Sequence, residues 1–130
     1  MKSKFQYITL FLLALGFGIS SCYYDDPPEP PPLDIDDISF STHVLPTFEK
    51  SCSTSNCHDG TSEPNLINDL AYAELLAGGY INIVIPEESI LFKTVDFQAG
   101  VDAMPPGGPK LPNIDIEVIK LWIQKGAPNN

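Results

Sequence analysis

Two cysteines and a histidine stand within seven consecutive residues, and this cluster restricts the possible folds more than any other part of the chain. The segment is Cys52-Ser-Thr-Ser-Asn-Cys57-His58. In an oxidising compartment, two thiols this close together bond to each other or to another group. The cluster therefore predicts a site built around a disulfide, a metal ion or a covalently held group.

The first 21 residues have the pattern of an export signal. Lys2 and Lys4 precede an apolar run at residues 7–19, which is short for a bilayer-spanning helix. Two serines then stand directly before Cys22, an order that resembles a bacterial lipobox. We predict a lipoprotein signal peptide over residues 1–21 and a lipid on the sulfur of Cys22, which would tether the chain in the cell envelope, at the outer membrane. An ordinary signal peptide and an uncleaved anchor are the alternatives.

Composition divides the rest of the chain into a linker and a domain, and its negative charge argues against nucleic acid as a partner. The formal net charge is −10, and removal of the two leader lysines makes it more negative. Such a chain repels nucleic acid, so we expect no nucleic-acid partner and instead a partner with a basic surface, unless the acidity serves only solubility. Residues 22–37 are rich in proline and acidic residues, which predicts an extended, disordered linker before a domain at residues 38–130.

Hydrophobic periodicity predicts helices in the first half of this domain. Residues 41–52 read as a short helix that begins at an N-cap formed by Ser41 or Thr42 and runs into the cysteine cluster. Residues 68–79 read as a second helix. Its expected apolar stripe consists of Leu70, Ala73, Leu76 and Ala77.

The second half of the domain contains one strand-like segment and two further helical segments. Residues 80–86 are apolar and β-branched, but no second strand is found to pair with them, so we expect a buried loop that walls a pocket. A helical stretch is expected from Pro86. The last helix is expected at residues 113–125 with Asn113 as its cap, and its broad apolar face consists of Val118, Ile119, Trp122 and Ile123. The fold class is therefore all-α.

Three interpretations of the cluster remain open. A Cys52–Cys57 disulfide would close a very short loop, stabilise the fold little and leave His58 without a role. A structural zinc site needs four nitrogen or sulfur ligands, and the domain offers only these three residues and His43, of which the adjacent Cys57 and His58 seldom reach one ion together. Covalent haem attachment needs two thiols for the two vinyl groups and a histidine directly after the second cysteine, as found here.

A haem site of this kind also needs a second axial ligand for the iron. Met1 belongs to the leader, so Met104 is the one other thioether in the chain. It precedes two prolines and two glycines at residues 105–108, which form a rigid loop suited to presenting its sulfur. His43 is the competing candidate, but it lies off the apolar face of the first helix, so we expect it at the surface. The four small residues between the cysteines are expected to bulge outward.

The order of these features resembles the single-haem class I cytochromes c. A helix carrying Phe48 precedes the Cys57-His58 pair, a central helix follows, and "MPP" from Met104 comes before a C-terminal helix with the sequence LWIQKGA. The likeness covers about residues 38–130 and is greatest to the small lipoprotein cytochromes of Bacteroidota, in which a C-x4-C-H variant occurs. The resemblance implies a small class I-like fold in which the first and last helices cross around one haem, with Phe48 near Trp122 and Leu121.

The same resemblance implies a function and a set of site residues. The cofactor would be haem c, attached covalently to Cys52 and Cys57, with His58 as the proximal iron ligand and Met104 as the distal one. With both axial positions filled, the chain would be a lipid-tethered single-electron carrier and not an enzyme, serving redox proteins that have a basic docking surface. The alternatives are a haem module of a peroxidase or dehydrogenase complex, and a haem-free surface lipoprotein with a disulfide.

Overall fold

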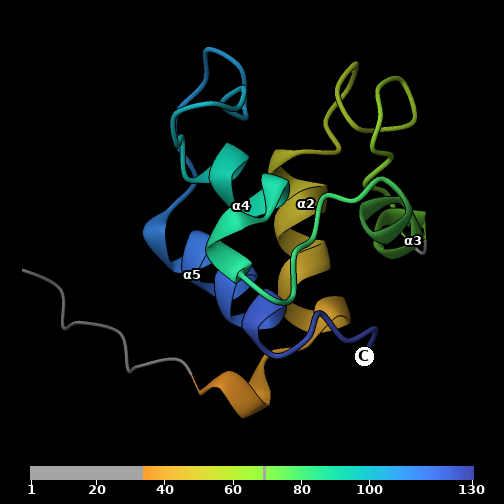
Figure 1. Cartoon of the computed structure of the whole chain (residues 1–130). Coiled ribbons are helices and arrows are strands. Elements are labelled where there is room, and N and C mark those ends of the chain that lie inside the picture. Colours follow the sequence, from red (N-terminus) through yellow and green to blue (C-terminus); the bar gives the residue numbers. More distant parts are fainter. Residues whose placement is uncertain (1–33, 69) are drawn as a thin grey trace, which may run out of the picture. The chain divides into compact units, whose positions relative to one another are not determined.

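The computed structural model describes residues 34–130 with the exception of Asp69, and these residues contain helices and loops but no strand (Figure 1). The predicted all-α class is therefore confirmed for this part of the chain. The elements are η1 (Ile35–Asp37), the π-helix η2 (Phe40–Val44), α2 (Leu45–Ser51), α3 (Leu70–Ala77), η3 (Pro86–Glu88), α4 (Ile90–Val95) and α5 (Asn113–Gln124).

The predicted signal peptide at residues 1–21, the predicted lipid attachment at Cys22 and most of the linker at residues 22–37 lie outside the described residues. The last linker residues form the short 3-10 helix η1. No helix in the described part of the chain combines the length and the apolar character needed to cross a bilayer.

Aromatic rings form the centre of the core, where η2 packs against α5. The Phe40 ring lies 5.3 Å from that of Trp122, 5.4 Å from that of Tyr72 and 6.4 Å from that of Phe48, measured between ring centroids. The sequence predicted that Phe48 would pack near Trp122 and Leu121, and it missed Phe40. The Phe40 ring contacts both Phe48 and Trp122 and so links the first helical segment to the last helix.

The first helical segment begins earlier than predicted, and this places Phe40 in the core. The N-cap is Ser39, whose hydroxyl accepts a hydrogen bond of 3.2 Å from the Thr42 backbone N–H, so the predicted caps Ser41 and Thr42 are wrong. The chain terminus closes the same end, because Asn130 accepts hydrogen bonds from the backbone N–H groups of Phe40 and Ser41.

The helix α3 turns a different face to the core from the one predicted. Its buried residues are Ala71 and Leu75, whereas all four residues of the predicted stripe are exposed. Apolar side chains lie on all sides of this helix, so periodicity alone does not select the packed face. The Tyr72 hydroxyl helps to fix the rotation of α3 by donating a 3.1 Å hydrogen bond to the Ala127 carbonyl.

The segment predicted as a buried loop is exposed at its centre. Val84 is 84% exposed, and its neighbours Ile83 and Ile85 are more than half exposed. The cause is a turn made by Asn82, whose side-chain oxygen accepts hydrogen bonds from the backbone N–H groups of Val84 and Ile85. The helical stretch predicted from Pro86 is present as η3 and α4.

The last helix agrees best with the prediction. The four residues of its predicted apolar face are all buried. Asn113 is the first helical residue and not the cap, a position that Pro112 occupies. The helix ends at Gln124, one residue before the predicted end, and Gly126 after it has a positive φ of 94°. The Ala127 N–H bonds to the Trp122 carbonyl at 3.0 Å and the Gly126 N–H to the Ile123 carbonyl at 2.9 Å, as in a Schellman motif.

Two adjacent leucines of α3 give a direct test of its orientation. Leu75 is 1% exposed and Leu76 is 45% exposed. Leu75→Ala is expected to lower the free energy of unfolding by about 2–5 kcal/mol because it leaves a cavity, and Leu76→Ala by at most about 0.5 kcal/mol. Urea unfolding followed by the fluorescence of the single tryptophan, Trp122, measures both. Equal losses would contradict this packing of α3.

Candidate functional site

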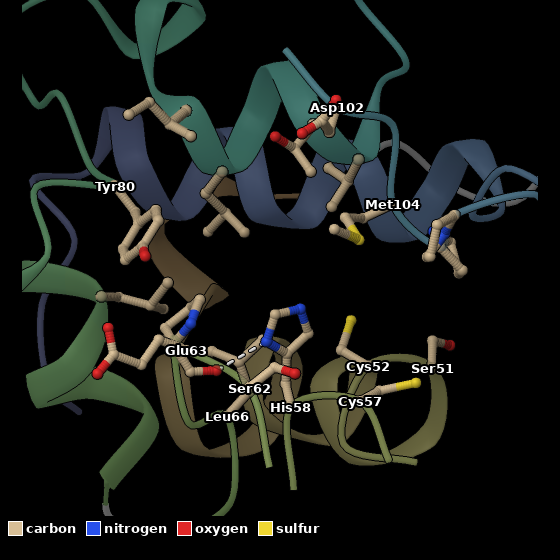
Figure 2. A pocket seen from close by; sticks show the side chains of 18 of the residues that line it. Ser51, Cys52, Cys57, His58, Ser62, Glu63, Leu66, Tyr80, Asp102 and Met104 are labelled. Atoms are coloured by element: carbon tan, nitrogen blue, oxygen red, sulfur yellow. Dashed lines mark hydrogen bonds between the residues drawn. The ribbon is translucent and has the colours of Figure 1, made fainter. Parts of the chain in front are cut away.

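A cavity of about 510 Å³ lies between two walls that come from separate parts of the chain. Cys52, Cys57 and His58 lie on one side of it and Met104 on the other (Figure 2). All four residues predicted for the site therefore line one space. Most of the other lining side chains are apolar, and they include Leu66, Leu75, Ile90, Leu91, Val95 and Val101.

The His58 ring is fixed by a hydrogen bond to the backbone of the following loop. Its Nδ1 lies 2.8 Å from the Pro64 carbonyl oxygen. Since a carbonyl oxygen only accepts, Nδ1 must carry the proton. The lone pair is then on Nε2, the nitrogen on the other side of the ring, which points into the cavity toward Met104 (Figure 2). A histidine held in this way is ready to act as a metal ligand.

The backbone also holds His58 in place. Its N–H donates to the Cys52 carbonyl at 3.1 Å, and its own carbonyl accepts from the Leu66 N–H at 2.9 Å. These two hydrogen bonds join the end of α2, the histidine and the start of the next buried segment. The imidazole therefore lies at a fixed distance from the cysteine that precedes the loop.

Met104 faces His58 from the opposite wall, and its sulfur points into the cavity (Figure 2). Its backbone N–H donates to the carbonyl of Thr94 in α4 at 3.1 Å, which attaches the loop to a helix. The following turn is closed by a 3.2 Å hydrogen bond from the Gly108 N–H to the Pro105 carbonyl, and Gly107 has a φ of 68°. Backbone hydrogen bonds therefore fix the loop that was predicted to present this sulfur, both at Met104 and in the turn that follows it.

The loop between the cysteines is exposed at its centre, although Thr54 and Asn56 also border the cavity. Residues 54–56 are exposed, and Asn56 adopts a left-handed φ of 65°. Both ends of the loop are anchored: the Ser53 hydroxyl donates to the Leu66 carbonyl at 2.7 Å, and Asp59 accepts from the Asn56 N–H at 3.2 Å. Hydrogen bonds from the Thr61 hydroxyl and from backbone N–H groups lower the pKa of the Asp59 carboxyl.

The two cavity cysteines are free thiols in this structure, with no disulfide between them. Both are half-buried. Burial, with a smaller contribution from the charge of Cys57, raises the pKa of the Cys52 thiol to about 11. The Cys52 sulfur points into the cavity, on the side where Cys57 also lies (Figure 2).

Among the described residues, no group of three or more histidine, cysteine, aspartate or glutamate side chains has the arrangement to hold a metal ion. His43 is not among the residues that line the cavity. It is half-buried, and its Nδ1 accepts a 3.2 Å hydrogen bond from the Ser39 N–H at the start of η2. His43 therefore lies away from the cavity lining, and it is half-buried where the sequence predicted a surface position.

The side chains that line the cavity fit a haem. A nitrogen donor and a sulfur donor lie on opposite walls of a largely apolar space. Both cysteines line one side of it: the Cys52 sulfur points into the space, and the Cys57 sulfur points toward Ser51 (Figure 2). These are the groups that a covalently attached, six-coordinate haem requires. The cavity volume is also within the range of sites for large ligands.

Tyr80 is the first residue of the segment predicted to wall a pocket, and it does line the cavity, whereas residues 81–86 do not. Its N–H donates to the Leu75 carbonyl and its carbonyl accepts from the Leu91 N–H, both at 3.1 Å, so it joins α3 to α4. Its ring lies against Gly78, where a Cβ atom would come within 2.2 Å of Tyr80 Cε2. The Gly78-Gly79-Tyr80 sequence could have indicated this close packing.

The raised pKa of Cys52 predicts slow alkylation of this thiol in haem-free protein. Only the thiolate reacts, so the reaction with iodoacetamide should still accelerate above pH 10, whereas an unperturbed cysteine with a pKa of about 8.5 levels off by about pH 9.5. Peptide mass spectrometry measures the extent of alkylation at Cys52 separately from that at the other cysteines. The same protein in urea is the control and should give the unperturbed profile. An unperturbed profile for the folded protein would contradict the burial of Cys52.

No protein-family model, no curated protein and no solved structure matches this chain. The functional interpretation therefore depends on the geometry of the cavity and on the chemistry of the residues that line it.

Proposed function

We propose that the domain at residues 38–130 binds one haem c covalently and carries single electrons, as a class I-like cytochrome c. The observation that carries the proposal is the opposed pair His58 and Met104, whose Nε2 and sulfur point at one another across an apolar cavity. The thiols of Cys52 and Cys57 at one edge of the same cavity supply the second requirement, two groups for thioether bonds.

Each residue would have one role. Cys52 and Cys57 would hold the haem by its vinyl groups, His58 would be the proximal iron ligand and Met104 the distal ligand. The bound iron supplies a one-electron couple, in which a donor protein is oxidised as Fe(III) is reduced to Fe(II). Ligation by histidine and methionine favours a raised reduction potential.

Other residues around the cavity would hold the two iron ligands in place and keep water away from the iron. The Pro64 carbonyl keeps the His58 ring in one orientation, and the Thr94 carbonyl holds the backbone of Met104. Ligands that do not move between the two oxidation states keep the cost of reorganisation low. The apolar walls formed by Leu75, Leu91 and neighbouring side chains exclude water from the iron.

If His58 and Met104 both bound the iron, no coordination site would be left for a substrate, which favours an electron carrier over an enzyme. The net charge of −10 supports an encounter with a redox protein that has a basic docking surface. Anchoring of Cys22 by lipid at the outer membrane would hold the carrier close to such a partner.

The proposal predicts a specific effect of removing the Met104 sulfur. Met104→Ala should abolish the methionine-to-iron charge-transfer band in the visible spectrum of the ferric protein while the haem stays bound, because the thioether bonds and His58 remain. Absorption spectroscopy of the purified ferric protein, with the haem content determined in parallel, measures both quantities.

Val101→Ala is the matched control, because Val101 also lines the cavity but has no ligand atom. It should keep the band. A band that survives in Met104→Ala would show that another group is the distal ligand.

A further inference from the structure

The segment that connects α3 to α4 contains a turn that exposes three aliphatic side chains in a row. They belong to Ile83, Val84 and Ile85, and these three residues are called the apolar turn below. Figure 1 shows the segment as it crosses from α3 to α4. A contiguous set of exposed apolar side chains with polar neighbours marks a surface that binds another molecule. The apolar turn is therefore a candidate docking surface.

Hydrogen bonds at the base of the apolar turn hold it in one conformation. The Ser89 side chain is buried, and its hydroxyl accepts from the Asn82 N–H at 2.8 Å and donates to the Asn82 carbonyl at 3.3 Å. A 3.1 Å hydrogen bond from the Leu91 N–H to the Tyr80 carbonyl closes the base. A surface that is ordered before it binds loses little conformational entropy when the partner arrives.

Two carboxylates follow the apolar turn directly, in η3. Glu87 pairs with Lys120 at 3.5 Å, and Glu88 pairs with Lys93. The acid is the more exposed side chain in both pairs, at 50% against 27% in the first and 56% against 24% in the second. Exposed ion pairs contribute little energy, so the cations of a partner can compete for these carboxylates. The apolar turn therefore has an acidic border on one side.

The apolar turn lies between two residues that line the cavity. Tyr80 precedes the turn and Ile90 follows it, and both are lining residues. Ile90 is also exposed, so it reaches from the cavity to the surface. Figure 2 shows Tyr80 across the His58–Met104 pair from the cysteines. A partner bound on the turn would therefore approach the cavity from the side opposite the cysteines.

The charge of the chain favours one kind of partner. A net charge of −10 repels anionic lipid headgroups, and a second copy of the chain carries the same charge. A protein site with an apolar centre and a rim of lysine or arginine would cover the three aliphatic side chains and attract the two carboxylates.

We propose that the apolar turn is the surface on which the domain docks a redox protein whose site has an apolar centre and a basic rim. The inference rests on the proposed function, because the bound haem would exchange the electron. In that exchange the partner loses one electron, and Fe(III) is reduced to Fe(II). Docking beside the cavity keeps the path of the electron short.

The test uses a basic mitochondrial cytochrome c in which zinc replaces the iron. Light excites its zinc porphyrin, which then loses one electron to the ferric haem of the full-length protein. Val84→Ser should lower the second-order rate constant about fivefold, because an apolar contact with the probe is lost. Leu70→Ser is the matched control: Leu70 is also exposed but begins α3, the end of that helix farther along the chain from the turn, so the rate should change less than twofold.

A second pair of variants tests the acidic border. Glu88→Gln should lower the rate about twofold at low ionic strength and weaken its dependence on salt, because one attraction between opposite charges is lost. Glu49→Gln makes the same change of net charge at an exposed residue of α2 and should have a smaller effect. Equal effects of the two variants would contradict docking beside η3.

The outcomes separate this inference from the proposed function. The visible spectrum should be the same in all four variants, because none of the substituted residues lines the cavity. A wild-type protein without covalent haem would overturn both proposals. Covalent haem in the wild type together with an unchanged rate in Val84→Ser would overturn the docking surface alone.

Two further measurements on the haem-loaded chain distinguish other occupants of the apolar turn. Sedimentation should show a monomer; a dimer that Val84→Ser dissociates would assign the turn to a second copy and overturn the proposal. The unlipidated chain should not float with phosphatidylcholine vesicles. Flotation that Val84→Ser abolishes would assign the turn to a lipid surface and would also overturn it.

Discussion

The 2.8 Å hydrogen bond between His58 Nδ1 and the Pro64 carbonyl is the interaction on which the site depends. It fixes the proton on Nδ1, so that Nε2 has a free lone pair directed into the cavity. The loop that carries Pro64 is itself held by the Ser53 hydroxyl and the His58 carbonyl, both of which bond to Leu66. These hydrogen bonds join the cysteine cluster, its loop and the buried Leu66 into one unit. This unit fixes the direction in which His58 Nε2 points.

The opposite wall is attached to a different part of the chain, so the cavity exists only when the core brings both walls together. Met104 is bonded to Thr94 in α4, and Tyr80 connects the ends of α3 and α4 through its backbone. The aromatic contact of Phe40 with Trp122 joins the segment before the cysteine cluster to α5, and α5 packs against α4. The distance between the nitrogen and sulfur donors is thus set by helix packing and not by the local sequence of either loop.

The sequence could single out Cys52, Cys57, His58 and Met104, which line one cavity, because their signals are chemical and local. The adjacency of Cys57 and His58 and the rigid loop after Met104 needed no knowledge of packing, and the strong periodicity of α5 identified its buried face. The start of η2, the buried face of α3 and the exposure of residues 83–85 were predicted wrongly, because each depends on contacts with distant residues. Phe40 is an example: its role follows from the ring of Trp122, more than eighty positions along the chain. Within the segment 80–86, only Tyr80 lines the cavity as predicted.

The most direct test of the central claim is a pyridine haemochrome spectrum of the full chain, purified after expression with a working cytochrome c maturation system. We expect haem that stays with the protein after acid–acetone extraction, with the absorption maximum of a haem held by two thioether bonds, at Cys52 and Cys57. A maximum typical of one thioether would show that only one of the two cysteines, Cys52 or Cys57, holds the haem. A colourless protein, or haem that is extracted completely, would contradict the account.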